Sequence, residues 1–414
     1  MAIKLSEKVL SLKPSASIAA KQRVSELQAE GRRIIDLTLG EPDMNTPALI
    51  IEAGVESMRA GQTHYTGSAG DASLRGAICE KLWRENSVEY SPEEIVVACG
   101  AKQLIQEAFS ATLNPGDEVI VPAPYWVSYP DIVRMNGGEP VIVECPAETG
   151  FQLSPDALEA AITDRTRWLI INSPGNPSGA VLSEAVWRGI LEVLARHPHV
   201  ALMTDEIYER ITYDGARNIT PVALDPALKD RCLIVNGMSK AYAMTGWRLG
   251  YAAGPRELIR SIVKLIGQST TCAAAFTQVA AREALQGDQA PVREMVETYA
   301  VRRSLVLDAL DTMPGVSCVP PGGAFYLFLN VNALLGCVAP DGRRIDSDLD
   351  LVSWFLDAEG LAVMDGTSYG MPGFLRLSFA ASTETLREGC AAMARAVEAL
   401  APEQTRLQKA NAND

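Results

Sequence analysis

Short apolar runs alternate with amphipathic stretches over the middle of the chain. Each run is apolar at nearly every position, which is typical of strands buried on both faces of a sheet. Several of the stretches between them repeat their apolar positions at helical spacing. The seven predicted strands are IVVACG, EVIVPA, EPVIVEC, RWLIINSP, VALMTDEIY, RCLIVNGMSK and RLGYAAG, and the predicted helices cover 71–86, 101–113, 154–162 and 183–196. This alternation predicts an α/β fold with a mostly parallel sheet covered by helices on both faces.

The two ends of the chain follow a different pattern. A helix and an apolar strand precede the alternating region, and helices with short strands follow it. The predicted elements are a helix over 16–30, the strand IIDLTL, a helix over 291–313, the apolar segment GVSCVPPGGAFYLFLNV, and helices over 347–359 and 383–400. At 414 residues the chain is longer than one hydrophobic core usually supports. We therefore predict a large domain over 48–290, a smaller α+β domain over 1–47 with 291–402, and a polar tail over 403–414.

Composition and charge argue against several classes of protein. With 37 basic and 51 acidic residues, the formal charge is −14, which disfavours nucleic acid and anionic membranes as partners. The segment MAIKLSEKVLSLKPS lacks the apolar stretch of a secretory signal, and no segment is apolar enough to span a bilayer. Eight scattered cysteines without a C-x-x-C pair indicate free thiols in a reducing cytoplasm. Three histidines and no G-x-S-x-G motif argue against a zinc site and a serine hydrolase, so no metal is expected.

Chemically active side chains gather where the predicted strands end. Asn176 follows one strand, and Asp205 and Tyr208 end the next. Lys240 ends a third strand, and Arg248 follows at once. Ligands of such sheets bind beyond the carboxyl ends of the strands. Each motif alone could equally be a turn or a salt bridge, but their order along the chain favours one shared site.

The lysine and the aspartate both stand in unusual surroundings. A free lysine has a pKa of about 10 and is a poor nucleophile at neutral pH, so a reactive lysine needs a site that depresses its pKa. Lys240 lies in a stretch of apolar and small residues, which fits a surface lysine badly. Asp205 ends an apolar strand, where an acid is costly without a partner.

These motifs resemble the class I aminotransferases among the fold-type I pyridoxal-phosphate enzymes, and most closely their bacterial aspartate aminotransferase branch. The resemblance covers almost the whole chain and rests on LKPSASIAA, LTLGEPD, HYTGSAG, PYWVSYP, NSPGNPSGAV, DEIYE, SKAYAMTGWRLGYAAGP, GGAFY and LRLSFA. The run SK-x-x-x-M-T-G-W-R-x-G-Y is highly specific, whereas D-E-I-Y and N-P-S-G are specific only in combination. The resemblance implies a large domain with a mostly parallel seven-stranded sheet, a smaller α+β domain and the cofactor pyridoxal 5′-phosphate.

The resemblance also implies roles around the cofactor ring. Lys240 would carry the cofactor covalently and later move a proton between the substrate and the cofactor. Asp205 would pair with the ring nitrogen and keep it protonated. Tyr208 and Asn176 would donate hydrogen bonds to the ring oxygen. Trp126 would stack on the ring, although a core tryptophan is the alternative interpretation.

A second group would hold the cofactor phosphate. Arg248 offers a planar guanidinium that suits two phosphate oxygens. Gly100, Ala101 and Lys102 begin a predicted helix, whose first N–H groups bind anions. Many relatives have a hydroxyl residue three positions before the lysine, where this chain has a glycine, and Ser239 is the adjacent candidate.

A third group would bind the substrate. Arg376, in LRLS, corresponds to the arginine that holds the substrate α-carboxylate in a bidentate pair. Gly40 would let the backbone approach that carboxylate closely. Asn176 would share the contact, and Trp126 would also face the substrate.

Substrate choice and assembly depend on further positions. A dicarboxylic substrate needs a second cation, and the resemblance offers Lys102 and Lys13. Tyr65 corresponds to the tyrosine that reaches the phosphate of the other subunit, which implies a homodimer with shared sites, whereas an ordinary turn tyrosine is the alternative.

The resemblance suggests aspartate as amino donor and 2-oxoglutarate as acceptor. The catalytic motifs leave other reactions open, namely an aminotransferase for aromatic, prephenate-like or other biosynthetic substrates, and a C–S lyase on the same fold. A non-enzymatic binding or regulatory protein is a further alternative. The chain has neither spare length nor a basic segment for a nucleic-acid-binding module, which disfavours it.

Overall fold

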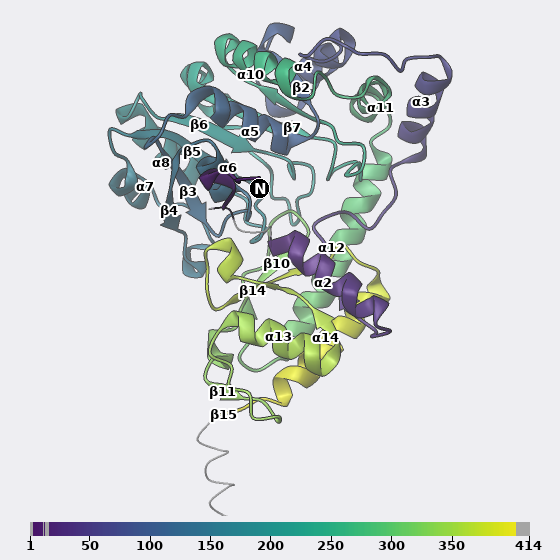
Figure 1. Cartoon of the computed structure of the whole chain (residues 1–414), viewed down its shortest axis with the longest axis vertical. Helices are drawn as coiled ribbons and strands as arrows, with labels where there is room; N and C mark the ends of the chain where they lie inside the picture. Colours follow the sequence, from purple (N-terminus) through teal and green to yellow (C-terminus); the bar gives the residue numbers. More distant parts are fainter. Residues whose placement is uncertain (1–2, 11, 13–15, 403–414) are drawn as a thin grey trace, which may run out of the picture.

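A seven-stranded sheet forms the centre of the larger part of the molecule (Figure 1). The computed structural model describes residues 3–10, 12 and 16–402. In spatial order the strands are β2 (Ile95–Ala98), β8 (Gly250–Ala253), β7 (Cys232–Gly237), β6 (Ala201–Asp205), β5 (Thr166–Asn172), β3 (Glu118–Ala123) and β4 (Glu139–Glu144). Only β8 runs antiparallel to its neighbours. The predicted mostly parallel sheet and its seven strands are therefore confirmed.

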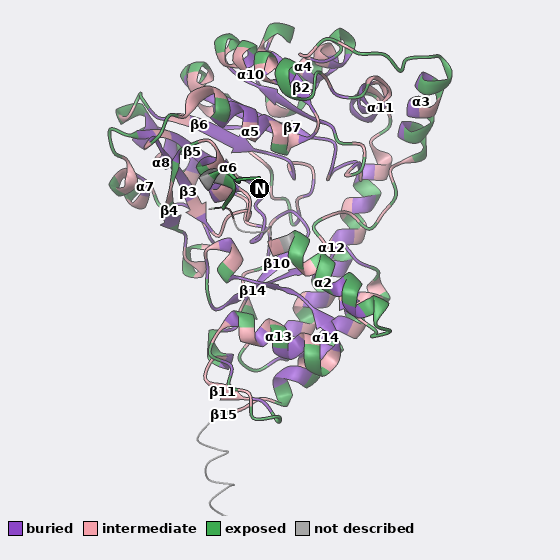
Figure 2. Ribbon diagram, viewed as in Figure 1, coloured by how far each residue is buried: buried purple, intermediate pink, exposed green. Residues whose placement is uncertain are grey.

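Helices cover both faces of this sheet because successive side chains of each strand point to opposite faces. Ile95 and Val97 pack in one core with α4 (Ala72–Asn86), α8 (Glu184–Arg196) and α11 (Ala275–Gln286). Val96 and Ala98 pack in another core with α5 (Ala101–Thr112), α6 (Tyr129–Met135) and α10 (Arg256–Ser269). Figure 2 shows most strands of this sheet as buried and the outer helix faces as exposed, whereas the edge strand β4 is largely exposed or half-buried. Two buried faces explain why the strands are apolar at nearly every position.

The chain ends meet in a third hydrophobic core, outside the large sheet. The antiparallel sheet there has the order β13 (Met364–Asp365), β14 (Phe374–Ser378), β10 (Tyr326–Asn330) and β9 (Ser317–Cys318). Three helices accompany it, α12 (Ala290–Leu310), α13 (Asp348–Glu359) and α14 (Thr383–Glu398). The purple helix α2 (Ala16–Ala29) lies beside these green and yellow elements in Figure 1. Ile35 and Leu37 pack in the same core as α12, α13 and α14.

The predicted strand IIDLTL is shorter than expected. The structure has only β1 (Ile35–Asp36), which pairs in parallel with β12 (Leu361–Ala362). The side chain of Asp36 accepts hydrogen bonds from the N–H and hydroxyl of Thr38, at 2.9 and 2.6 Å. This local turn competes with strand pairing and directs the chain towards Gly40.

The remaining elements are short or peripheral. They are α1 (Glu7–Leu10), α3 (Ala48–Arg59), α7 (Pro155–Ala161), α9 (Pro221–Leu224), β11 (Cys337–Val338) and β15 (Ala401–Pro402). None of the helices that the structure describes combines the length and apolar character needed to cross a membrane. The predicted tail 403–414 lies outside the described residues.

Candidate active site

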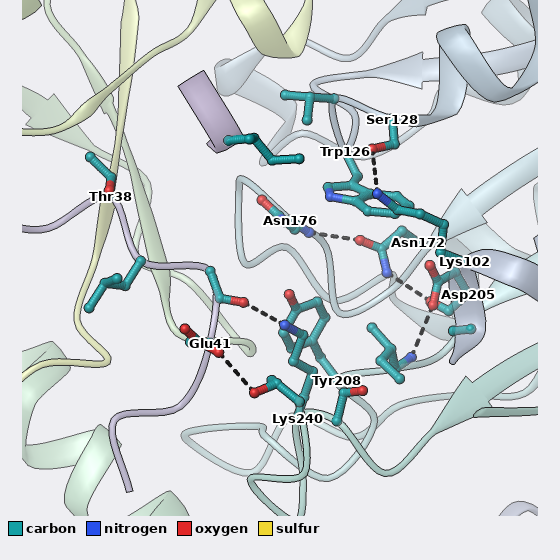
Figure 3. Close-up of a pocket in the computed structure, with 18 of the residues that line it drawn as sticks. Thr38, Glu41, Lys102, Trp126, Ser128, Asn172, Asn176, Asp205, Tyr208 and Lys240 are labelled. Atoms are coloured by element: carbon teal, nitrogen blue, oxygen red, sulfur yellow. Dashed lines mark hydrogen bonds between the residues drawn. The ribbon is translucent and has the colours of Figure 1, made fainter. Parts of the chain in front are cut away.

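A cavity of about 590 Å³ opens at the carboxyl ends of β5, β6 and β7. The segment that follows β1, the helix α2 and Arg376 of β14 close it from the other side, so the cavity lies between the large sheet and the core of the chain ends (Figure 3). The predicted residues that line it are Gly40, Ala101, Lys102, Trp126, Asn176, Asp205, Tyr208, Ser239, Lys240, Arg248 and Arg376. The fold therefore brings together most of the residues that the sequence predicts for the site.

Lys240 lies in the turn after β7 and reaches across the cavity. Its Nζ donates a hydrogen bond to the carbonyl oxygen of Gly40, which Figure 3 shows as a dashed line. Burial lowers the pKa of Lys240 to about 8, and the charges of Arg376 and Arg248 also lower it, against the raising effect of Glu41. At pH 7 about a tenth of such an amine is unprotonated, compared with roughly 0.03% for a pKa of 10.5. This depressed pKa is what a reactive lysine requires.

Asp205 is buried at the end of β6. Its Oδ2 accepts a hydrogen bond from the Tyr129 hydroxyl at 2.7 Å, and its Oδ1 accepts one from the Ile207 N–H at 3.3 Å. Burial raises the pKa of Asp205 to about 6, although these two hydrogen bonds and the Lys240 charge lower it. Asn172 donates to the backbone carbonyl of Asp205 at 2.8 Å and so fixes the strand end.

Arg376 is only 1% exposed and is held from several sides. One Nη donates to the Thr38 carbonyl at 2.5 Å and the other to Asn176 Oδ1 at 3.2 Å. The guanidinium lies 4.6 Å from the ring centroid of Tyr326. Its Nε has no hydrogen-bond partner among the described residues. A buried arginine with donor capacity to spare suits a carboxylate ligand.

Tyr208 faces the same part of the cavity. Its hydroxyl shares a hydrogen bond of 2.9 Å with the hydroxyl of Tyr326. Burial raises the pKa of Tyr208 well above its ordinary value, and Tyr326 adds to this effect. Tyr208 is therefore a neutral donor at physiological pH.

The helix α5 begins at the edge of the cavity without a side-chain cap. Gly100 precedes it with a φ of 93°, and no side chain among the described residues caps the helix. The positive φ requires glycine at this position, and a Cβ there would also displace the end of the Arg248 side chain, whose Nη2 would lie 2.7 Å away. Gly250 of β8 likewise lets the backbone of Ala101 approach. Free N–H groups at a helix start, next to a guanidinium, form a site for a phosphate group.

Trp126 forms one wall of the cavity. Lys102 Nζ lies 4.6 Å from the centroid of its ring and bonds to the Ser128 hydroxyl at 3.2 Å. Burial lowers the pKa of Lys102, as does the charge of Arg248. Trp126 also packs edge-to-face on Tyr129, with ring centroids 5.2 Å apart.

Of the predicted residues that the structure describes, Gly100 and Tyr65 do not line the cavity. Tyr65 is 85% exposed and lies outside it. Lys13 lies outside the described residues.

Several further residues line the cavity or support it and were not predicted from the sequence. They are Thr38, Glu41, Asn172, Tyr129 and Tyr326, together with Lys21 and Gln22 of α2. Tyr129 and Tyr326 stand in PYWVSYP and GGAFY, so their motifs were visible but their contacts were not. For α2 the sequence carried no signal, because only the meeting of the two chain ends places it over the cavity.

The residues fit pyridoxal phosphate. The amine with a depressed pKa suits the aldehyde of this cofactor, and the buried acid suits its ring nitrogen. The uncapped helix start beside Arg248 suits its phosphate, and the flat indole wall suits its ring. This fold and site define a pyridoxal-phosphate enzyme of fold type I. The family described as aminotransferase class I and II matches residues 32–393, and the chain belongs to that family.

Named relatives agree with this family. The chain is 47% identical over 378 residues to an aspartate aminotransferase of Rhizobium meliloti strain 1021, covering 91% of this chain and 92% of that one. It is 46% identical to an aspartate/prephenate aminotransferase of Cereibacter sphaeroides, covering 94% and 97%. The crystal structure of the Rhizobium meliloti aspartate aminotransferase matches with a TM-score of 0.94 and 45% identity, covering 97% of this chain and 100% of that one. The Thermus thermophilus aspartate aminotransferase with maleate matches with a TM-score of 0.89 and 40% identity, covering 95% and 100%. The chain is thus a pyridoxal-phosphate-dependent aminotransferase similar to the bacterial aspartate aminotransferases.

Proposed function

We propose that this aminotransferase transfers the amino group of L-aspartate to a 2-oxo acid, with 2-oxoglutarate as the usual acceptor. The carrying observation is that Lys240, Arg376 and Lys102 all line one cavity. Transamination of a dicarboxylic amino acid requires a reactive lysine and one cation for each of the two substrate carboxylates. The names of the relatives in Rhizobium and Thermus support this choice of donor.

Each side chain around the proposed cofactor position has a separate role. When bound, pyridoxal phosphate supplies an aldehyde that links to amines and a ring that accepts electrons. Lys240 would provide the attaching amine and the base that takes the proton from the substrate α-carbon. Asp205 would hold negative charge at the ring nitrogen, Tyr208 and Asn176 would donate hydrogen bonds to the ring oxygen, and Trp126 would cover the ring face.

The phosphate and the substrate α-carboxylate are held at separate places. The start of α5 at Gly100, Ala101 and Lys102, with Arg248 and Ser239, would hold the phosphate. Arg376 would hold the α-carboxylate, beside the Gly40 backbone. Because Arg376 already contacts Asn176, one arginine orients the substrate relative to a group that also contacts the cofactor.

Lys102 is our candidate for the second carboxylate of the substrate. It lies over the Trp126 wall and bonds to Ser128, so its ammonium is free of any carboxylate within the described part of the chain. Lys13 remains a second candidate from the sequence. Lys21 of α2 also lines the cavity but is paired with Glu41 at 3.5 Å.

Absorbance spectra of the purified protein test the proposal. Adding L-aspartate should convert the band of the bound cofactor to that of its amine form, and 2-oxoglutarate should restore the first band. A steady-state comparison with phenylalanine and alanine then ranks the donors. The proposal fails if aspartate is the poorest of the three.

A second candidate acceptor is a prephenate-like 2-oxo acid. It is favoured by the name of the Cereibacter sphaeroides relative, which is an aspartate/prephenate aminotransferase. Prephenate should then restore the first absorbance band as well as 2-oxoglutarate does. A C–S lyase is the remaining alternative, and release of pyruvate and ammonia without any acceptor would identify it.

We further propose a cytoplasmic homodimer in which Tyr65 reaches the site of the partner subunit. Its 85% exposure and its place outside the cavity support a role that one subunit alone cannot complete. All eight cysteines are free, as expected in a reducing compartment. A Tyr65→Phe variant mixed with a Lys240→Ala variant should recover activity through hybrid dimers, whereas monomers in solution would contradict the proposed homodimer.

We assign residues 48–290 to the large domain and 1–47 with 291–402 to the small one.

A further inference from the structure

Among the residues that the structure describes, Tyr129 is the one side chain that donates a hydrogen bond to the Asp205 carboxylate. The two groups come from different elements, because Asp205 ends β6 and Tyr129 begins α6. The Tyr129 hydroxyl donates to Asp205 Oδ2 at 2.7 Å, within the buried part of the protein. Tyr129 itself is 2% exposed. A hydrogen bond to an ionised group in such surroundings is roughly twice as strong as a neutral one.

Tyr129 is held in place independently of Asp205. Its backbone N–H donates to the Trp126 carbonyl at 3.0 Å, which makes residues 126–129 a tight turn. Its ring packs edge-to-face on the Trp126 ring at an interplanar angle of 82°. Burial raises the pKa of Tyr129 well above its ordinary value, so the hydroxyl keeps its proton and remains a donor. The turn that carries the aromatic wall therefore also presents a fixed donor to the acid.

We propose that Tyr129 is a positioning residue for transamination, which holds the Asp205 carboxylate ionised and oriented towards the ring nitrogen of the cofactor. This inference rests on the proposed role of Asp205. A carboxylate has about four acceptor positions, and the hydrogen bonds from Tyr129 and the Ile207 N–H use two of them. The others remain for a donor in the cavity. Trp126 and Asp205 are thereby fixed relative to each other through one side chain.

The charges around Asp205 show why the tyrosine matters. Two titratable groups interact with the Asp205 carboxylate. Lys240 faces it across the cavity, and Tyr208 lies on the loop that follows Asp205. The charge of Lys240 lowers the pKa of Asp205, but the amine that carries this charge would also be the group that attaches the cofactor. The hydrogen bond from Tyr129 does not involve Lys240. Without it, burial would favour the protonated acid, which cannot hold a proton on the ring nitrogen.

The test uses the holoenzyme of Tyr129→Phe, which keeps the ring and its contact with Trp126. The control is Tyr90→Phe. Tyr90 is also buried, but its hydroxyl has no hydrogen-bond partner among the residues that the structure describes, and it does not line the cavity. The protonation of the ring nitrogen is followed by NMR with ¹⁵N-labelled pyridoxal phosphate between pH 5 and 9, beside the pH profile of kcat/KM and thermal unfolding.

We expect the ring nitrogen of wild-type and Tyr90→Phe protein to stay protonated at pH 7. In Tyr129→Phe its resonance should move towards the unprotonated position, and the acidic limb of kcat/KM should rise by about one pH unit, since one unit corresponds to the lower end of a charged hydrogen bond. A loss of activity at all pH values with an unchanged limb and an unchanged ¹⁵N resonance would overturn the inference. An unprotonated nitrogen in the wild type would instead refute the role of Asp205 itself.

Discussion

Substitution of Gly250 by alanine should damage the phosphate site without touching any charged group. Gly250 lies on β8 between β2 and β7, and the start of α5 passes directly over it. An alanine Cβ would lie 2.4 Å from the Ala101 nitrogen and 2.7 Å from the Gly100 carbonyl carbon. Both are backbone atoms, so no flexible side chain can move aside. The helix start must shift by about 1 Å to reach ordinary van der Waals contact.

The size of the effect follows from that shift. Overpacking of a buried site costs about 1–3 kcal/mol of unfolding free energy. Hydrogen bonds to a charged group contribute about 1.5–3 kcal/mol each, so weakening one at the phosphate should reduce affinity about tenfold or more. Both losses come from one methyl group and should appear together.

Urea unfolding of the apoprotein measures the first effect. Binding of pyridoxamine phosphate, which cannot link to Lys240, measures the second. The control is Gly76→Ala on α4, where nothing lies within 4 Å of the new Cβ. Alanine there should stabilise the protein by about 0.5–1 kcal/mol, because it improves helix propensity. If Gly250→Ala loses stability but binds pyridoxamine phosphate normally, the helix start does not hold the phosphate.

The remaining predictions concern the charged residues of the site and its support. Lys240→Ala should keep the fold and lower turnover by at least about 10²–10⁴-fold, the usual contribution of a proton-transfer group, and near-normal turnover would refute the central assignment. Attachment of pyridoxal phosphate to the apoenzyme should accelerate with rising pH and level off above about 8, since only the unprotonated amine of Lys240 reacts; a midpoint near 10.5 in stopped-flow absorbance would contradict the depressed pKa. Arg376→Ala should raise KM for every amino acid about 30-fold or more, corresponding to about 2 kcal/mol, and a loss limited to one substrate would make Arg376 a side-chain contact. Lys81→Met should lower the free energy of unfolding in urea by about 3–5 kcal/mol, because Lys81 is 1% exposed and pairs with the buried Glu209. If the double variant with Lys81→Met and Glu209→Gln is no more stable than Lys81→Met alone, an unpaired charge is not the cause.

The residue after Asp205 belongs to a separate network outside the cavity, although both acids stand in the motif DEIY. Glu206 follows Asp205 but points into a separate buried network, where its carboxylate accepts hydrogen bonds from Thr220 and Asn218, each at 2.7 Å. Burial raises the pKa of Glu206 to about 7, and Glu209 adds to this. Two neighbouring acids on one strand end therefore have different surroundings because alternate side chains face opposite sides of the sheet.

The hydrophobic pattern alone determined the large sheet and the residues at its edge. Strands such as CLIVNG are buried throughout, so continuous apolar runs marked them, and the parallel arrangement placed Asp205 and Lys240 at one edge. The pattern did not fix the length of β1, because the turn at Asp36 depends on a side-chain hydrogen bond. It also did not reveal α3, whose Gly54 packs on the Trp247 ring.

Contacts between segments distant in sequence were decided only by the tertiary structure. Arg376 meets Asn176 and Thr38 across separations of 200 and 338 residues, and Tyr129 meets Asp205 across 76. Local periodicity reports which face of an element is buried, but not which partner covers it. The sequence thus determined which residue types stand at the strand ends. Packing of α6 against the sheet decided the donor to Asp205. Packing of the chain ends against the sheet decided the pKa of Lys240 and the enclosure of the cavity.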